Sequence, residues 1–170
     1  STYRPVAVYA SDVNGDGITE LPRAVLMAGY KDTSSSAAVY MLDWYAYGIG
    51  KVPAKVATTY QNISDAWSLL IDQKWHDRIT AIKANDGGLS YVEFFEYRKN
   101  KMSIPLFNIY CATGSNREYY AERTDLIQLG QTTQAIYFAK LTNEGEQSEL
   151  ALTGDEIKAR FSLVNQAWNN

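Results

Sequence analysis

A nine-residue stretch near the start of the chain, Asp12 to Glu20, constrains the fold more than any other feature. Its sequence, DVNGDGITE, places oxygen-bearing side chains at alternate positions and ends on an acid. Gly17 permits a sharp bend where a Cβ would be strained. Because Ca²⁺ takes about six to eight oxygen ligands, this spacing predicts a calcium loop. The predicted ligands are Asp12, Asn14, Asp16, Glu20 and the backbone carbonyl of Ile18.

The alternative to a calcium loop is an Asx-rich tight turn without metal, because Asn-Gly and Asp-Gly are ordinary turn formers. An EF-hand is excluded on two grounds. Its loop closes with a bidentate Glu at the twelfth position, which is Arg23 here. The residues before the loop, Val6 to Tyr9, have the pattern of a strand rather than a helix. We therefore expect the loop to join two strands.

The loop resembles that of FG-GAP (VCBS-type) repeats, in which a calcium turn joins two strands of a β-propeller blade. Strand-like runs surround it at Pro5–Tyr9, Arg23–Met27 and Ala37–Tyr45. The resemblance implies calcium bound by the five residues above and implies no reaction. The chain also resembles, more loosely, the C-terminal part of secreted Gram-positive bacterial lipoproteins that carry such repeats, through Trp67–Ile71, Trp75, the run Ile79–Lys83 and a C-terminal helix. A lipid anchor would then lie upstream of Ser1, because this segment has no lipidation cysteine.

The composition is that of a globular protein, with 46% hydrophobic and 21% charged residues. A net charge of −3 without a basic cluster argues against nucleic-acid binding. No apolar run is long enough to span a bilayer. The single cysteine, Cys111, can form no internal disulfide. Extracellular calcium modules bind with a Kd of about 10⁻⁴–10⁻³ M, and cytosolic calcium would leave such a site empty. We therefore expect an extracellular or cell-surface location.

Strands dominate the rest of the chain, because short runs rich in β-branched and aromatic residues alternate with turn signals. Further strands are expected at Lys55–Gln61, Trp67–Ile71, Arg78–Lys83, Leu89–Tyr97, Leu106–Cys111 and Gln134–Leu141. A short helix is expected within Thr113–Arg123. Near the C-terminus, Thr153 and Glu156 form a capping-box pattern that begins an amphipathic helix. Its expected apolar stripe consists of Ile157, Phe161, Val164 and Trp168.

Strands followed by a terminal helix predict an α+β fold with largely antiparallel sheets. Residues 1–58 are expected to form a β-rich unit with the calcium loop. Residues 59–170 are expected to form an α+β module that ends in the helix and packs with the first part as one compact unit. A looser likeness to Mog1/PsbP-like domains, carried by Trp67–Ile71, Trp75 and the strand near Ile79, offers an α/β sandwich as the alternative.

Residues that could support catalysis are scarce in this sequence. His76 and Cys111 are the only histidine and cysteine, and we interpret them as a turn residue and a buried thiol. Nucleophile-elbow, phosphate-loop and zinc-cluster motifs are absent from the sequence. Thirteen Tyr and four Trp, by contrast, form a polar-tipped aromatic set that serves either sheet packing or recognition. The aromatic clusters are Tyr40, Trp44, Tyr45 and Tyr47, and the pair Tyr119–Tyr120.

Two functions are consistent with these features. The first is a non-catalytic extracellular or cell-envelope module, with a structural calcium site, that binds a protein or polysaccharide. The second is a secreted hydrolase whose acidic catalytic residues have no recognisable motif. Paired carboxylates of that kind are defined by their separation in space rather than in sequence.

Overall fold

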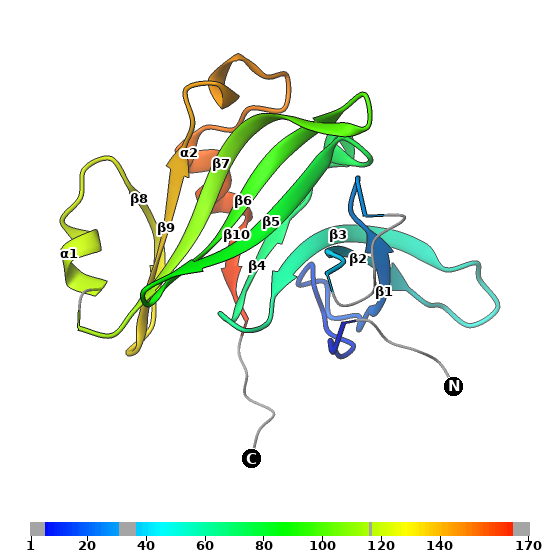
Figure 1. Ribbon diagram of the computed structural model, residues 1–170. Coiled ribbons are helices and arrows are strands. Elements are labelled where there is room, and N and C mark those ends of the chain that lie inside the picture. Colours follow the sequence, from blue (N-terminus) through cyan, green and yellow to red (C-terminus); the bar gives the residue numbers. More distant parts are fainter. Residues whose placement is uncertain (1–5, 31–36, 116, 165–170) are drawn as a thin grey trace.

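A computed structural model describes residues 6–30, 37–115 and 117–164 as two antiparallel β-sheets with short helices beside them (Figure 1). The first sheet comprises, in spatial order, β1 (Leu21–Leu26), β2 (Tyr40–Ala46), β3 (Ala54–Asn62), β4 (Trp67–Leu70) and β10 (Phe161–Leu163). The second comprises β5 (Ile79–Asp86), β6 (Leu89–Arg98), β7 (Lys101–Thr113), β9 (Ala135–Leu141) and β8 (Ile127–Gln131). The prediction of a β-rich α+β fold with antiparallel sheets is confirmed.

Helical segments are short. They are α1 (Arg117–Ala121), α2 (Gly154–Arg160), and the 3₁₀ turns η1 (Gln73–Trp75) and η2 (Gly145–Gln147). Neither α-helix has the length or apolarity needed to cross a bilayer, and the described residues contain no other candidate. The strands predicted between Arg23 and Leu141 all coincide with observed strands whose ends differ by a few residues, whereas β8 and β10 are not among the predicted strands.

Tight turns set the register of the second sheet. Asp86 pairs with Leu89, so the β5–β6 hairpin has a two-residue loop, Gly87-Gly88, with φ of 56° and 93°. Positive φ at both loop positions defines the turn that suits the right-handed twist of paired strands. The β6–β7 hairpin turns at Lys99-Asn100 in the same left-handed region, without glycine. β5, β6 and β7 therefore pair in sequence order, whereas β9 lies between β7 and β8.

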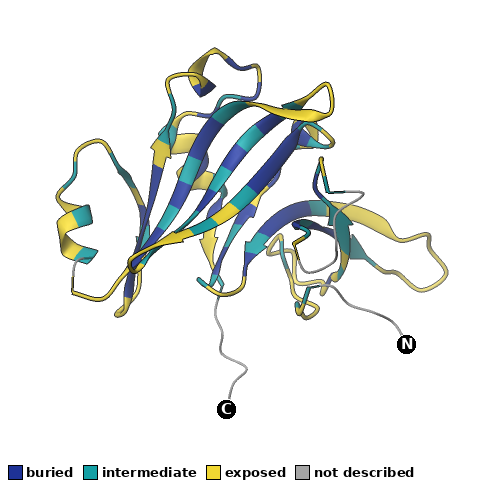
Figure 2. Cartoon of the chain, in the orientation of Figure 1, coloured by how far each residue is buried: buried dark blue, intermediate teal, exposed yellow. Residues whose placement is uncertain are grey.

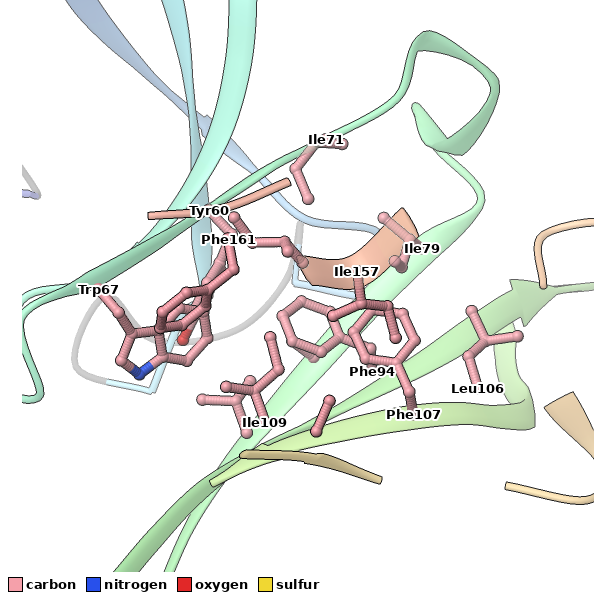
Figure 3. Close-up of a cluster of buried hydrophobic side chains, with 14 of the residues drawn as sticks. Tyr60, Trp67, Ile71, Ile79, Phe94, Leu106, Phe107, Ile109, Ile157 and Phe161 are labelled. Carbon is pink, nitrogen blue, oxygen red and sulfur yellow. The ribbon is translucent and has the colours of Figure 1, made fainter. Parts of the chain in front are cut away.

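One hydrophobic core joins the two sheets (Figure 3). The Tyr60 ring of the first sheet lies 5.4 Å from the Phe94 ring of the second, edge to face, and 5.4 Å from Trp67. Phe94 in turn stacks on Phe107 at 4.8 Å. Exposed residues gather where the strands leave this core, most visibly at the protruding β2–β3 hairpin (Figure 2). The boundary expected after residue 58 falls inside β3, and β10 from the C-terminal part completes the first sheet.

The terminal helix begins as expected but is shorter. Thr153 Oγ1 accepts from Glu156 N at 3.2 Å, and Thr153 N donates to Glu156 Oε2 at 2.8 Å, which completes the capping box. The helix ends at Arg160, because Phe161 pairs with Leu69 at the open edge of β4 and stacks on Trp67. Of the expected stripe, Ile157 therefore lies in the helix, Phe161 in β10 and Val164 after β10. Its last member, Trp168, lies outside the described residues.

The strand expected before the loop does not form over the described residues 6–9. Pairing there is limited to one bridge, in which Ser11 and Glu20 exchange backbone hydrogen bonds of 3.1 and 2.9 Å. Residues two apart in a strand direct their backbone groups to the same side. Pro22 therefore stands where the next donor would be needed, and it has no N–H. Residues 6–10 consequently run beside β1 without joining the sheet.

Candidate metal centre

Backbone donors converge on Asp12 at the start of the loop. Its Oδ1 accepts hydrogen bonds from Gly15 N at 2.7 Å and Asp16 N at 3.2 Å, and its Oδ2 accepts from Gly17 N at 2.9 Å. These bonds, the one from Gly17 foremost, lower the pKa of Asp12 below its ordinary value. Gly15 and Gly17 have φ of 77° and 83°, a conformation that glycine adopts without strain. The Asp12 carboxylate is therefore held ionised inside a tightly wound turn.

The middle of the loop is held by its own side chains. Asn14 Oδ1 accepts from Asp16 N at 3.0 Å, and Asn14 Nδ2 donates to Asp16 Oδ2 at 2.9 Å. Asp16 Oδ1 accepts from Ile18 N at 2.8 Å. Such bonds are those of an Asx-rich turn. The loop therefore has the hydrogen bonds of the Asx-rich turn predicted as the alternative.

Glu20 differs from the other loop acids because it is fully buried, with 0% of its surface exposed. Its Oε2 accepts a hydrogen bond from Val13 N at 2.9 Å. Its Oε1 is buried and has no hydrogen-bond partner. A buried charged acceptor without a donor costs at least about 1–3 kcal/mol. A cation or an ordered water at this oxygen would therefore lower the free energy of the folded loop.

Asp12, Asp16 and Glu20 each place a carboxylate oxygen within 4.8 Å of the other two. Two oxygens that both lie about 2.4 Å from one Ca²⁺ ion are at most about 4.8 Å apart, so the spacing fits a shared cation. The cluster could hold a metal ion. Three of the five predicted ligands supply these carboxylate oxygens. Asn14, a fourth, lies in the same turn and is hydrogen-bonded to Asp16.

His76 and Cys111 do not meet. His76 Nε2 lies 3.6 Å from Asp43 Oδ1, beside a hydrogen bond of 2.6 Å from Thr58 Oγ1 to the same oxygen. Cys111 is buried in β7. Burial, with a smaller contribution from the charge of Asp65, raises the pKa of its thiol to about 11. Such a thiol is a poor nucleophile, and the expectation that it is a buried core residue agrees with its position.

A second buried carboxylate, Glu96, is fully partnered. Ser148 Oγ donates to its Oε2 at 2.6 Å, and Arg98 and Arg78 both donate to its Oε1. Burial alone would raise the pKa of Glu96, but the hydrogen bonds from Ser148 and Arg98 outweigh it and lower the pKa. Glu96 thus ties β6 to the segment after η2. Unlike Glu20, Glu96 has a hydrogen-bond donor at each of its two carboxylate oxygens.

The aromatic clusters mostly serve packing. Trp44 is buried, and its indole N–H donates to Thr59 Oγ1 at 2.8 Å. Tyr40 and Tyr45 are half-buried in the same strand. Tyr47 and Tyr119 remain mostly exposed, at 55% and 65%. Sheet packing therefore accounts for the β2 aromatics, and Tyr47 is the member of that cluster that is free to contact a partner.

A groove of about 570 Å³ lies between residues 6–10 and β1, the two segments that flank the candidate metal centre in the sequence. Tyr9, Tyr47 and Arg23 are among its lining residues. A second hollow of about 560 Å³ lies at α1 and has a mainly polar lining with one acid, Glu118. Sequence patterns did not indicate either hollow. The proline that interrupts strand pairing, Pro22, is the one local signal for the groove.

No family model, curated protein or solved structure matches this chain.

Proposed function

We propose that the loop from Asp12 to Glu20 is a structural calcium site. The observation that carries the proposal is the unpartnered, buried Oε1 of Glu20 beside the carboxylates of Asp12 and Asp16. Three carboxylates within 4.8 Å repel one another, and one of them has lost its contact with water. A divalent cation at their centre removes the repulsion and supplies the missing partner for Oε1.

The donor chemistry favours calcium over other divalent cations. The cluster contains oxygen donors and no nitrogen or sulfur, whereas zinc sites are built mainly from His and Cys. Magnesium requires a nearly ideal octahedron and usually keeps several waters, with one or two carboxylates. Three carboxylates with an additional amide and carbonyl in the same turn suit the larger and more irregular calcium shell. The FG-GAP-type resemblance of the loop supports the same ion, with Asn14 and Ile18 completing the set.

We further propose that the protein is a non-catalytic extracellular or cell-surface module that binds a protein or an envelope polymer. The calcium site lies in the connection leading into β1, and within the described residues 6–30 it has no flanking helix pair that could convert binding into a large movement. Its role is to hold the corner between residues 6–10 and the first sheet. The calcium concentration outside cells keeps such a site filled. The Mog1/PsbP likeness remains a prediction about the fold.

The arrangement of the other acids favours binding over hydrolysis. A glycosidase needs two carboxyl groups about 5–10 Å apart on either side of the scissile bond. Of the two described hollows, the groove beside β1 has no acidic lining residue and the one at α1 has a single acid. The buried carboxylates of Asp43 and Glu96 are engaged by Thr58 and by arginines, respectively. The hydrolase alternative therefore has less support.

Two measurements test the calcium site. Isothermal titration calorimetry measures calcium binding, and thermal denaturation compares the melting temperature in calcium and in EDTA. Wild-type protein should bind one Ca²⁺ per chain and melt at a higher temperature in calcium than in EDTA. Asp16→Ala should abolish both effects. Asp86→Ala is the matched control, because Asp86 also precedes a glycine in an exposed turn but lies outside the loop. An unchanged melting temperature of the wild type in calcium and EDTA would refute the site.

A further inference from the structure

The groove beside β1 combines two exposed aromatic rings with one unpaired cation. Tyr9 is 76% exposed and Tyr47 is 55% exposed, and both line the groove together with Arg23. Solvent-exposed aromatic side chains at a concave site are more typical of a recognition surface than of core packing. Tyrosine faces pack against the C–H groups of pyranose rings, and tyrosine hydroxyls hydrogen-bond to sugar hydroxyls. The two rings therefore suit a saccharide chain.

Arg23 favours a ligand that carries a negative charge. It is exposed, and its guanidinium has no hydrogen-bond or ion-pair partner among the described residues. Its neighbour across the sheet is Asp43, but that carboxylate is buried and is engaged by Thr58 and Lys55. An arginine fork pairs with a carboxylate through two parallel hydrogen bonds. A sugar that carries a carboxylate would meet both the cation and the rings.

Strand addition by a peptide is less compatible with this edge. An extended peptide that joins a sheet edge gains affinity from main-chain hydrogen bonds. The outward-facing position next to the Ser11–Glu20 bridge is Pro22, which offers no N–H, and residues 6–10 already run along this edge. The groove therefore recognises its occupant through side chains. That mode fits a polysaccharide better than a β-strand.

The metal loop and the groove are parts of one continuous segment, residues 6–26. Residues 6–10 and β1 are the two arms on either side of the loop, and both arms line the groove. The backbone of Arg23 follows that of Glu20 by three residues, about 10 Å of extended chain, and charges at a comparable distance are only partly screened, because the Debye length is about 10 Å at 0.1 M salt. Without calcium the three loop carboxylates carry a formal charge of −3, and one Ca²⁺ reduces it to −1. An anionic ligand at Arg23 is repelled less when the loop is filled.

We propose that this groove binds an acidic, uronate-containing polysaccharide and that binding requires calcium in the adjacent loop. The proposal rests on the calcium site proposed above and names the class of polymer that the module recognises. Calcium acts here by fixing the two arms and by lowering the negative charge beside Arg23. The saccharide ring stacks on Tyr9 and Tyr47 while its carboxylate pairs with Arg23.

The experiment uses the whole chain and a hyaluronan hexasaccharide, with the neutral chitohexaose as the matched probe. Calorimetry in calcium should detect the acidic hexasaccharide and not the neutral one, and EDTA or Asp16→Ala should abolish binding. Arg23→Gln should weaken binding about tenfold, the loss expected for a charged hydrogen bond. Tyr9→Ala and Tyr47→Ala should each weaken it about three- to tenfold. Tyr119→Ala, an equally exposed tyrosine outside the groove, should bind as the wild type does.

Several outcomes overturn the proposal while leaving the calcium site intact. These are a calcium-dependent melting temperature with no hexasaccharide binding, equal binding of chitohexaose, or tighter binding of poly-glutamate than of the saccharide. Binding that is insensitive to Arg23→Gln also overturns it. The variants are surface substitutions, and their thermal melts in calcium confirm that each remains folded. Failure of calcium to bind at all would instead refute the metal site on which the proposal rests.

Discussion

Replacing Glu20 by Gln separates the metal site from the plain turn, because the two interpretations predict opposite signs. The substitution keeps the shape of the side chain and an oxygen to accept from Val13 N. It removes the buried charge and converts the unpartnered Oε1 into an amide that can donate. In the absence of metal, Glu20→Gln should therefore stabilise the protein. In calcium it should destabilise the protein relative to the wild type.

The structure sets the size of both effects. A buried charged acceptor without a partner costs about 1–3 kcal/mol. For a chain of this length each 1 kcal/mol moves the melting temperature by about 2–4 °C. Glu20→Gln should thus melt about 2–12 °C above the wild type in EDTA. Calcium at about a hundred times its Kd stabilises a binding-competent protein by about 2.7 kcal/mol, and the variant should lose most of that gain.

The assay is differential scanning calorimetry of wild type and Glu20→Gln, each in EDTA and in a calcium series. Asp16→Asn provides a second comparison, because it removes an exposed loop carboxylate and should lower calcium affinity without the same gain in EDTA. The reasoning is refuted if Glu20→Gln melts below the wild type in EDTA, since the buried carboxylate would then be satisfied without metal. A calcium response retained in Glu20→Gln would equally exclude Glu20 as a ligand.

Three other substitutions or conditions test the rest of the structure. Glu96→Gln should cost about 1–3 kcal/mol in a urea melt, because the hydrogen bonds from Ser148 and Arg98 lose their charged acceptor. The pKa of Glu96 is lowered in the folded state from its ordinary value of 4.5. The ionised side chain therefore stabilises the fold above pH 4.5, and this contribution is lost as the pH falls below that value. Glu96→Gln should flatten this part of the curve of stability against pH. Pro22→Val supplies the missing N–H, and hydrogen exchange should show protection of the new amide as the ladder extends past the Ser11–Glu20 bridge. Cys111 should resist a thiol reagent at neutral pH in the folded state and react on unfolding, because it is buried with a pKa of about 11.

Features set by a few neighbouring residues were predictable from the sequence. The tight turn within Asp12–Glu20 follows from Asx residues at alternate positions and a glycine at the bend, and the hydrogen bonds that Asp12 and Asp16 accept span five residues or fewer. The Gly87-Gly88 hairpin and the Thr153–Glu156 capping box are likewise local. In each case hydrogen bonds or backbone preferences of residues a few positions apart determine the conformation. Such features can be predicted directly from sequence patterns.

Features that depend on distant partners were decided by the tertiary structure. Phe161 lies at helical spacing from Ile157, yet the open edge of β4 and the ring of Trp67 hold it in a strand. The burial of Glu20, which turns an acidic turn into a candidate metal centre, cannot be inferred from the loop sequence. The groove exists because residues 6–10 pass beside β1 without pairing. The sequence by itself determined which residues can supply oxygen ligands. Only the packing of the chain around the loop decided that one of those oxygens lacks both water and a donor, because burial depends on contacts that local spacing does not encode.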